Sequence, residues 1–229
     1  MNRDTEAFME SEPKMRVKRF VTTPNQENVY VYYNEDSRTG IVVDPGGSAD
    51  RILKFIKDNE LSIPYILLTH GHFDHIMAVD EVKKATRALV AASDAERELL
   101  RNSKLNLAWE VLKTDYGVEV DLPLFEGDVL RLGDISFSVI STPGHTSGGV
   151  CFYVEEEGVL FSGDTLFYES VGRVDLPTAS PEALDQSLIK LFNMLPDYVR
   201  VYPGHSRPTS IEHERLNNPY YVKNTNNIR

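Results

Sequence analysis

Cysteine is nearly absent from this sequence, since Cys151 is the only one in 229 residues. A single cysteine excludes an intramolecular disulfide framework and a zinc site built from several thiolates, and it fits a reducing compartment. Long hydrophobic runs are also missing, because no segment approaches the ~18 apolar residues that a membrane-spanning helix needs. The first fourteen residues contain no apolar stretch like that of a secretory signal. We therefore expect a cytoplasmic protein with no membrane contact.

Basic residues are also scarce. The chain has 24 Lys and Arg against 35 Asp and Glu, which gives a formal net charge of -11. Nucleic-acid binding depends on basic side chains that neutralise phosphates, so this balance argues against a nucleic-acid partner. We expect a small-molecule substrate instead.

Strand-like and helical segments alternate along residues 15–229, which we interpret as one domain after a polar tail, residues 1–14. The predicted strands are residues 15–21, 29–34, 40–44, 65–69, about 135–139, 150–155, 159–164 and 198–205. Helical spacing of apolar residues predicts a helix over 49–59, one after position 93, one around Trp109, one over 181–195 and a short one at the end. This order favours an α+β fold in which two packed sheets carry helices outside.

Three serines are candidate helix N-caps. Ser48 precedes the first predicted helix, and Ser93 with Glu96 fits a capping box. Ser180 followed by Pro181 is a typical helix start, because proline at the first helical position lacks only an N–H that would be unpaired anyway.

Histidines follow strand-like segments. Of the six histidines, five occupy such places, in THGHFDH (69–75), TPGHTSGG (142–149) and YPGHSRPT (202–209), and Asp164 ends another strand in FSGDT. In an extended chain the side chains of residues i and i+2 point to the same side, so His70 and His72 can reach one metal ion together. Asp74 and His75, at the turn into a helix, can reach a second.

Imidazole and carboxylate groups are the usual ligands of zinc, and they also suit iron or manganese. We therefore predict a site for two divalent metal ions with seven ligands, and zinc is the first candidate for both ions. One ion takes His70, His72 and His145, the other takes Asp74, His75 and His205, and Asp164 bridges them. Two ions ~3.5–4 Å apart hold a bridging hydroxide that attacks a carbonyl, so the prediction is hydrolysis. Asp74 also orients that water.

Several residues near these segments have two interpretations. Asp44, at the end of a strand, either hydrogen-bonds a ligand histidine or forms a turn before Pro45. Phe167 and Tyr168 follow Asp164 and either wall the substrate pocket or belong to the core. Arg173 either lines the pocket mouth or pairs with a neighbouring aspartate. We carry Phe167, Tyr168 and Arg173 as candidate substrate-binding residues.

Three other side chains have ordinary structural explanations. Cys151 lies in a predicted strand and is expected to be a small core residue. Arg207 is expected to be a solvated charge, although it could meet a substrate carboxylate. His213 lies in a charged helix and is expected at the surface.

The sequence resembles the metallo-β-lactamase superfamily, whose pattern T-H-x-H-x-D-H matches residues 69–75 and whose later ligands match His145, Asp164 and His205. The resemblance runs from about residue 15 onward and implies an αββα sandwich of the metallo-β-lactamase type. Within the superfamily, GDTLFYESVGRVDLP (163–177) is similar to a segment of short glyoxalase II-like proteins, also called hydroxyacylglutathione hydrolase-like. Their ending differs here at Ser206, Arg207 and Glu212.

This resemblance implies a thioester hydrolase that acts on a substrate such as an S-2-hydroxyacylglutathione. A thiolate leaves easily, since its conjugate acid has a pKa of ~8.5, so little help from a general acid is needed. Other activities on the same fold stay open. They are a persulfide dioxygenase with one iron at the positions of His70, His145 and Asp164, a lactonase, a nucleic-acid-processing enzyme and a metal-binding protein without activity.

Overall fold

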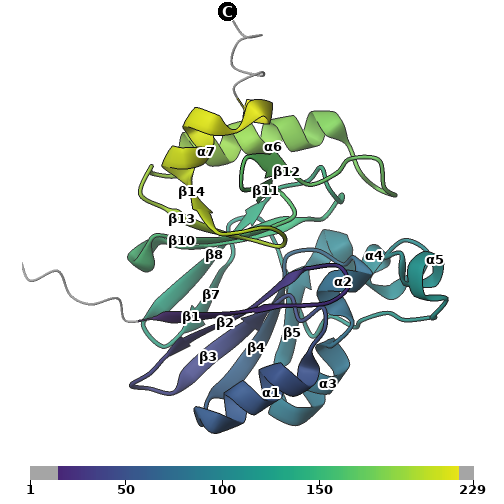
Figure 1. Ribbon diagram of the computed structural model, residues 1–229, viewed down its shortest axis with the longest axis vertical. Coiled ribbons are helices and arrows are strands. Elements are labelled where there is room, and N and C mark those ends of the chain that lie inside the picture. Colours follow the sequence, from purple (N-terminus) through teal and green to yellow (C-terminus); the bar gives the residue numbers. More distant parts are fainter. Residues whose placement is uncertain (1–14, 222–229) are drawn as a thin grey trace, which may run out of the picture.

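The computed structural model describes residues 15–221 as two β-sheets packed face to face, with helices on both outer faces (Figure 1). The predicted αββα sandwich is therefore confirmed. The predicted polar tail, residues 1–14, lies outside the described residues. Within the described part of the chain, no helix is long and apolar enough to cross a membrane.

The first sheet is built by the first half of the chain. Its strands, in spatial order, are β1 (Arg16–Val21), β2 (Asn28–Asn34), β3 (Thr39–Val43), β4 (Ser62–Leu68), β5 (Leu89–Ser93) and β6 (Leu122–Leu124). The strands from β3 to β6 run parallel, so their carboxyl ends share one edge. Helices α1 (Ala49–Asp58) and α3 (Val79–Thr86) cover its outer face (Figure 1).

The second sheet is built by the second half. Its spatial order is β14 (Thr209–Ser210), β13 (Arg200–Pro203), β10 (Val159–Gly163), β9 (Val150–Val154), β8 (Ile135–Ser141) and β7 (Val129–Leu132). Helices α6 (Pro181–Met194) and α7 (Ile211–Asn217) cover it, and β11 (Leu166–Phe167) pairs with β12 (Ser170–Val171) beside it. The remaining elements are the helices α2 (Phe73–Ile76), α4 (Arg97–Arg101) and α5 (Ala108–Leu112) and the 3₁₀ turns η1 (Asp94–Glu96) and η2 (Glu155–Glu157).

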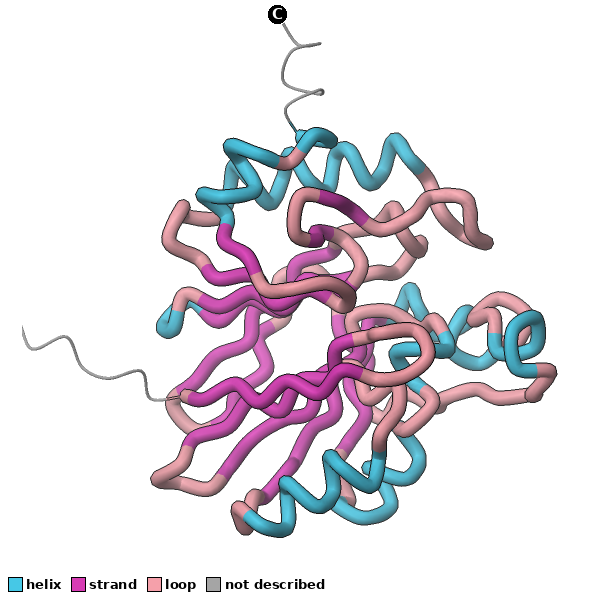
Figure 2. Tube along the Cα trace, viewed as in Figure 1, coloured by secondary structure: helices cyan, strands magenta, loops and turns pink. Residues whose placement is uncertain are grey.

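The layer between the two sheets is aromatic. Tyr32 of the first sheet packs edge-on against Phe137 and Phe161 of the second, with ring centroids 6.0 and 5.4 Å apart. Along β8 the burial alternates, as the spacing of Ile135, Phe137 and Val139 predicted. This packing fixes the two sheets against each other. The loops at their shared edge, pink in Figure 2, are therefore held at fixed positions relative to one another.

Only one of the three candidate serine N-caps forms a capping hydrogen bond. Helix α1 begins after Ser48, but the Ser48 side chain makes no capping bond, because its backbone is left-handed with φ 57°. The capping box of Ser93 and Glu96 is wrong, since Ser93 caps nothing and Glu96 bonds elsewhere. Ser180 caps α6 as predicted, and its Oγ accepts a hydrogen bond from the Ala183 N–H at 3.2 Å.

Removing the α6 cap is expected to lower the free energy of unfolding by about 1 kcal/mol, because Ser180→Ala leaves an N–H of the first turn without its partner. Urea unfolding of the purified protein measures this loss. Ser48→Ala is the matched control, since the Ser48 side chain makes no capping bond. An equal loss in both variants would contradict the capping role.

The helix predicted after His75, without bounds, is divided into α2 and α3, and strand β5 was not predicted. Helix α3 buries only Val79 and Val82 and turns a charged face to solvent, so its apolar stripe is too narrow to stand out in the sequence. The small residues Ala91 and Ala92 in β5 have low strand propensity and are buried because β4 and β6 flank them.

Candidate metal centre and its cleft

Two groups of three side chains meet at the edge where the sheet loops converge. The first is His70, His72 and His145, and the second is Asp74, His75 and His205, each with one ligand atom per residue within 4.8 Å of the others. Nδ1 of His72 lies 2.9 Å from Nε2 of His145. The structure thus brings together the two groups that the sequence analysis assigned to separate ions.

Asp164 lies between the two groups. Its Oδ2 is 3.4 Å from Nε2 of His145 and 3.6 Å from Nε2 of His205. Its Oδ1 is 3.3 Å from Nε2 of His75. One carboxylate therefore faces histidines of both groups, which is the position that a bridging ligand needs.

The cluster fits divalent cations because several of its polar atoms are buried without a partner. Nε2 of His70 and of His72 have no hydrogen-bond partner, and Nε2 of His75 and Oδ1 of Asp164 face only each other, at 3.3 Å. Each unpaired buried polar atom costs about 1–3 kcal/mol, so this arrangement is unfavourable unless a cation shares these atoms. Neutral imidazoles and carboxylates are the donor set of zinc, iron and manganese sites.

The protonation states of His70, His72 and Asp164 favour the same use. Burial and the neighbouring His75 hold the pKa of His70 well below its usual range, and burial with His145 lowers the pKa of His72 to about 3. Both imidazoles are therefore neutral at neutral pH and keep a free lone pair. Burial alone would raise the pKa of Asp164, but His75 outweighs it and holds that pKa well below the usual value. Asp164 is thus a carboxylate.

Asp44 supports the cluster from behind. Its Oδ1 accepts the Thr69 N–H at 2.7 Å, and its Oδ2 accepts the Thr69 hydroxyl at 2.6 Å. Nδ1 of His75 lies 3.0 Å from the same Oδ2, in position to donate. Of the two interpretations of Asp44, the structure shows the contact with a candidate ligand histidine. Such a contact fixes the ring, so that its other nitrogen points into the site.

Gly204 shows how closely the site is packed. A Cβ at this position would lie 2.3 Å from Oδ1 of Asp164 and 2.6 Å from the His75 ring. Only glycine leaves this space open, which explains why the Pro-Gly turn stands before His205.

Two buried glutamates near the site were not predicted. Oε1 of Glu96 accepts the Gly71 N–H at 3.1 Å, and Oε2 accepts the Gly148 N–H at 2.8 Å. Glu96 therefore joins the loop of His70 and His72 to the loop of His145, and burial raises its pKa to about 7. Glu27 is fully buried, neither of its carboxyl oxygens has a hydrogen-bond partner, and burial raises its pKa well above the usual value.

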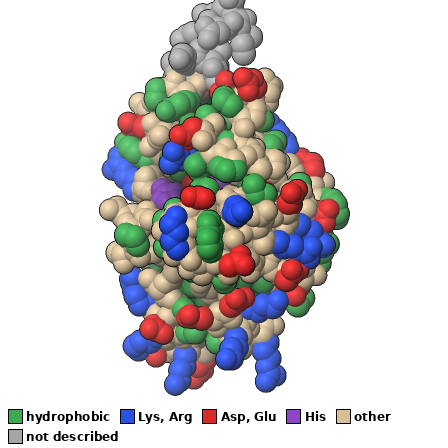
Figure 3. All heavy atoms as spheres, turned by 90° about the vertical axis from the view of Figure 1, so that its right-hand side faces the viewer, with side chains coloured by type: hydrophobic (Ala, Val, Ile, Leu, Met, Phe, Trp, Pro, Cys, Tyr) green, Lys and Arg blue, Asp and Glu red, His purple; other side chains and the backbone are tan. Residues whose placement is uncertain are grey.

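A cleft of about 520 Å³ opens onto both groups. It is lined by Asn25, His72, Phe73, Asp74, Leu107, Val111, His145, Asp164, Phe167, Ser170, Val171, Arg173, Leu176 and His205. The histidines themselves are mostly covered, and on the face seen in Figure 3 imidazole surface forms one small patch among charged side chains. The volume is within the range of small-molecule sites.

Comparison with known proteins places this geometry in a family. Residues 22–205 match the metallo-beta-lactamase superfamily. The chain belongs to this superfamily. A relative, hydroxyacylglutathione hydrolase GloC of Haemophilus influenzae, is 30% identical over 208 residues, which cover 90% of this chain and 98% of that protein.

Solved structures agree with this membership. The crystal structure of BLEG-1 B3 metallo-beta-lactamase has a TM-score of 0.85 and 37% identity, and it covers 90% of this chain and 100% of that one. That of TTHA1623 in a di-iron-bound form has a TM-score of 0.77 and 36% identity, over 89% and 100%. Together with the His and Asp cluster, these findings make this superfamily member a metal-dependent hydrolase.

In this superfamily member, the candidate substrate-binding residues lie in two different hollows. Phe167 and Arg173 line the cleft, as one interpretation predicted. Tyr168 faces a different hollow, where the Arg207 guanidinium lies 3.7 Å from its ring centroid and His213 stacks on its ring at 4.9 Å. Tyr168 therefore does not wall the metal cleft. Arg207, predicted as a solvated charge, is indeed exposed, and its guanidinium lies over the Tyr168 ring.

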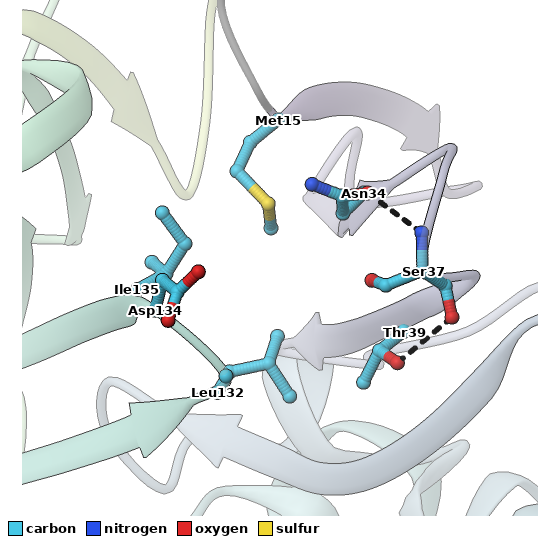
Figure 4. A pocket seen from close by; sticks show the side chains of 8 residues that line it. Met15, Asn34, Ser37, Thr39, Leu132, Asp134 and Ile135 are labelled. Atoms are coloured by element: carbon cyan, nitrogen blue, oxygen red, sulfur yellow. Dashed lines mark hydrogen bonds between the residues drawn. The ribbon is translucent and has the colours of Figure 1, made fainter.

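A further hollow of about 200 Å³ lies at the other end of β8 (Figure 4). Met15, Leu132 and Ile135 form its apolar side, and Asn34, Ser37 and Thr39 form its polar side. Among the described residues, no histidine or cysteine lines this hollow.

Proposed function

We propose that this protein hydrolyses a small-molecule thioester, such as an S-2-hydroxyacylglutathione. The reaction would use two divalent metal ions, for which zinc is the first candidate. The observation that carries the proposal is the pair of three-residue groups with Asp164 between them, opening together into one cleft. The name of the GloC relative supports a thioester of this kind. The di-iron form of TTHA1623 supports a site for two ions, with iron as an alternative to zinc.

When bound, divalent ions supply Lewis acidity and lower the pKa of a coordinated water from ~15.7 toward ~7. His70, His72 and His145 would hold one ion, and Asp74, His75 and His205 the other. Asp164, ionised between the two groups, would bridge them and offset part of their charge. Asp74 reaches this centre from the first turn of α2 and would also orient the attacking water.

Other residues fix the ligand rings, and the described residues that line the cleft include no lysine, cysteine or tyrosine as a separate proton donor. Asp44 holds the His75 ring, and the Arg173 carbonyl accepts from Nδ1 of His145 at 2.8 Å, which fixes that ring as well. A thiolate leaving group, whose conjugate acid has a pKa of ~8.5, needs little protonation as it departs. An ester or amide leaving group needs more, so the site suits a thioester best.

The deciding experiment measures thiol release from S-lactoylglutathione and simpler thioesters by purified protein, with the metals counted in the same sample. Chelator-sensitive release with about two ions per chain is the expected result. No release from any thioester would overturn the proposal. One iron per chain with oxygen consumption on a persulfide would replace it with the dioxygenase alternative.

Hydrolysis of a β-lactam is a second candidate, because the BLEG-1 structure, of a B3 metallo-beta-lactamase, is 37% identical to this chain. When the C–N bond of a β-lactam ring breaks, the ring nitrogen becomes an amine of the opened product and must take up a proton, and the described residues that line the cleft include no lysine. We therefore expect much slower turnover of a chromogenic cephalosporin than of a thioester under the same conditions. The opposite order would favour the second candidate.

A further inference from the structure

The metal cleft has an apolar part of its lining, which we call the apolar wall. Six of its lining residues are hydrophobic and come from separate segments of the chain, namely Phe73, Leu107, Val111, Phe167, Val171 and Leu176. The Phe167 ring lies edge-on against the His205 ring, with centroids 5.8 Å apart. The apolar wall therefore begins directly beside the candidate metal ligands.

The outer part of this wall is a single turn of chain around α5. The Val111 N–H bonds to the Leu107 carbonyl at 3.0 Å, so the two side chains lie one turn apart on the same side. Val111 is 54% exposed although it lines the cleft. An apolar group bound there would cover hydrophobic surface that is otherwise in contact with water.

Hydrogen bonds join this turn to the segment that carries the candidate ligands His72 and Asp74. The Phe73 N–H, at the start of α2, bonds to the Asn106 carbonyl at 2.8 Å, and the Asn106 side chain accepts the Ala108 N–H at 2.9 Å. Leu107 has a left-handed backbone with φ 70°, which a bulky residue adopts only when its surroundings hold it. The wall is thus pre-formed at a fixed distance from the candidate ligands.

The side chains that line the cleft include few that could bind an anionic group of a substrate. Arg173 is the only lysine or arginine among the described residues that line it. Its Nε and Nη2 already bind the two carboxylate oxygens of Asp175, at 2.6 and 2.7 Å. A negatively charged substrate group would meet that carboxylate as well as the guanidinium, so apolar contact is the stronger source of selectivity here.

We infer that the protein prefers thioesters with an aliphatic acyl group, whose chain packs along Leu107, Val111 and Phe167. This inference rests on the proposed thioester hydrolysis and narrows its substrate class. Leu107 and Val111 then determine specificity, because they meet the part of the acyl chain that is remote from the reacting carbonyl.

The test compares butanoyl, hexanoyl and lactoyl thioesters of one neutral thiol, N-acetylcysteamine. We expect kcat/KM to rise about fourfold for each added methylene, the transfer value of a buried CH₂, and therefore about 16-fold from butanoyl to hexanoyl. In Val111→Ser this ratio should fall below about fourfold. Leu112→Ser is the matched control, since Leu112 follows directly, is 43% exposed and does not line the cleft.

A flat or falling trend with chain length in an active enzyme would overturn the inference and leave thioester hydrolysis standing. If no thioester is hydrolysed, binding still tests the wall, because Trp109 is the only tryptophan and lies on α5. Its fluorescence is titrated with S-hexyl and S-methyl ethers of the same thiol. Tighter binding of the hexyl ether by wild type but not by Val111→Ser supports the wall, and equal binding of both ethers by wild type contradicts it.

Discussion

Asp164→Asn is expected to lower kcat/KM for thioester hydrolysis by about 1000-fold, equivalent to about 4 kcal/mol of transition-state stabilisation. The Asp164 carboxylate faces His75, His145 and His205, so it contacts both three-residue groups. A neutral amide of the same shape offsets no cationic charge, and its NH₂ group is no ligand. We expect fewer than two bound ions per chain.

Steady-state kinetics and elemental analysis of the same preparations measure this effect. Asp134→Asn is the control, because it removes one negative charge at the exposed hollow beyond the other end of β8 and should change neither quantity. Full activity of Asp164→Asn with two ions bound would contradict the bridging role. Thermal unfolding of both variants shows whether the fold is kept.

Glu96→Gln is expected to weaken metal binding about 10- to 100-fold, the usual effect of removing a group that orients a ligand. Glu96 is only 1% exposed and accepts the N–H groups of Gly71 and Gly148, one on each side. Glutamine can accept only one of them, because its NH₂ group would face the other N–H. One of the two loops that carry His70, His72 and His145 then loses its anchor.

Competition with a chromophoric chelator gives the affinity, and the visible spectrum of the Co²⁺-loaded protein reports the ligand geometry directly. Glu98→Gln, two residues away on α4 and exposed, is the matched control. A loss of stability alone would leave the spectrum of the folded, loaded protein unchanged. An unchanged affinity and spectrum in Glu96→Gln would show that this glutamate does not position the ligands.

The residues that the structure brings together at this candidate site could be named from the sequence because its chemistry is local. His70, His72, Asp74 and His75 lie within six residues, and the parallel strand β4 before them directs all four to one edge. The later histidines also follow strands, and in a sandwich these strand ends meet. The seven candidate ligands could therefore be named without knowing how the sheets pack.

The residues that support the ligands could not be predicted, because their contacts join segments that are far apart in the sequence. In the sequence, Glu96 fits a capping box with Ser93. Only the fold shows that its carboxylate accepts the N–H groups of Gly71 and Gly148, which lie on two loops far apart in the sequence. Glu27 lies in a polar segment that gives no sign of full burial. Tyr168 follows Phe167 directly, but neighbours in a β-strand or its turn face opposite sides, so one lines the cleft and the other does not.

The division of the chain into two sheets has a consequence for assembly. The strands of the first sheet end at Leu124, and those of the second begin at Val129. Each three-residue group takes two members from before this turn and one from after it. Ions bound there cross-link the halves, so metal affinity and the affinity of one half for the other are reciprocally coupled. If the chain were cut at this turn, the association of its two fragments would strengthen with metal concentration.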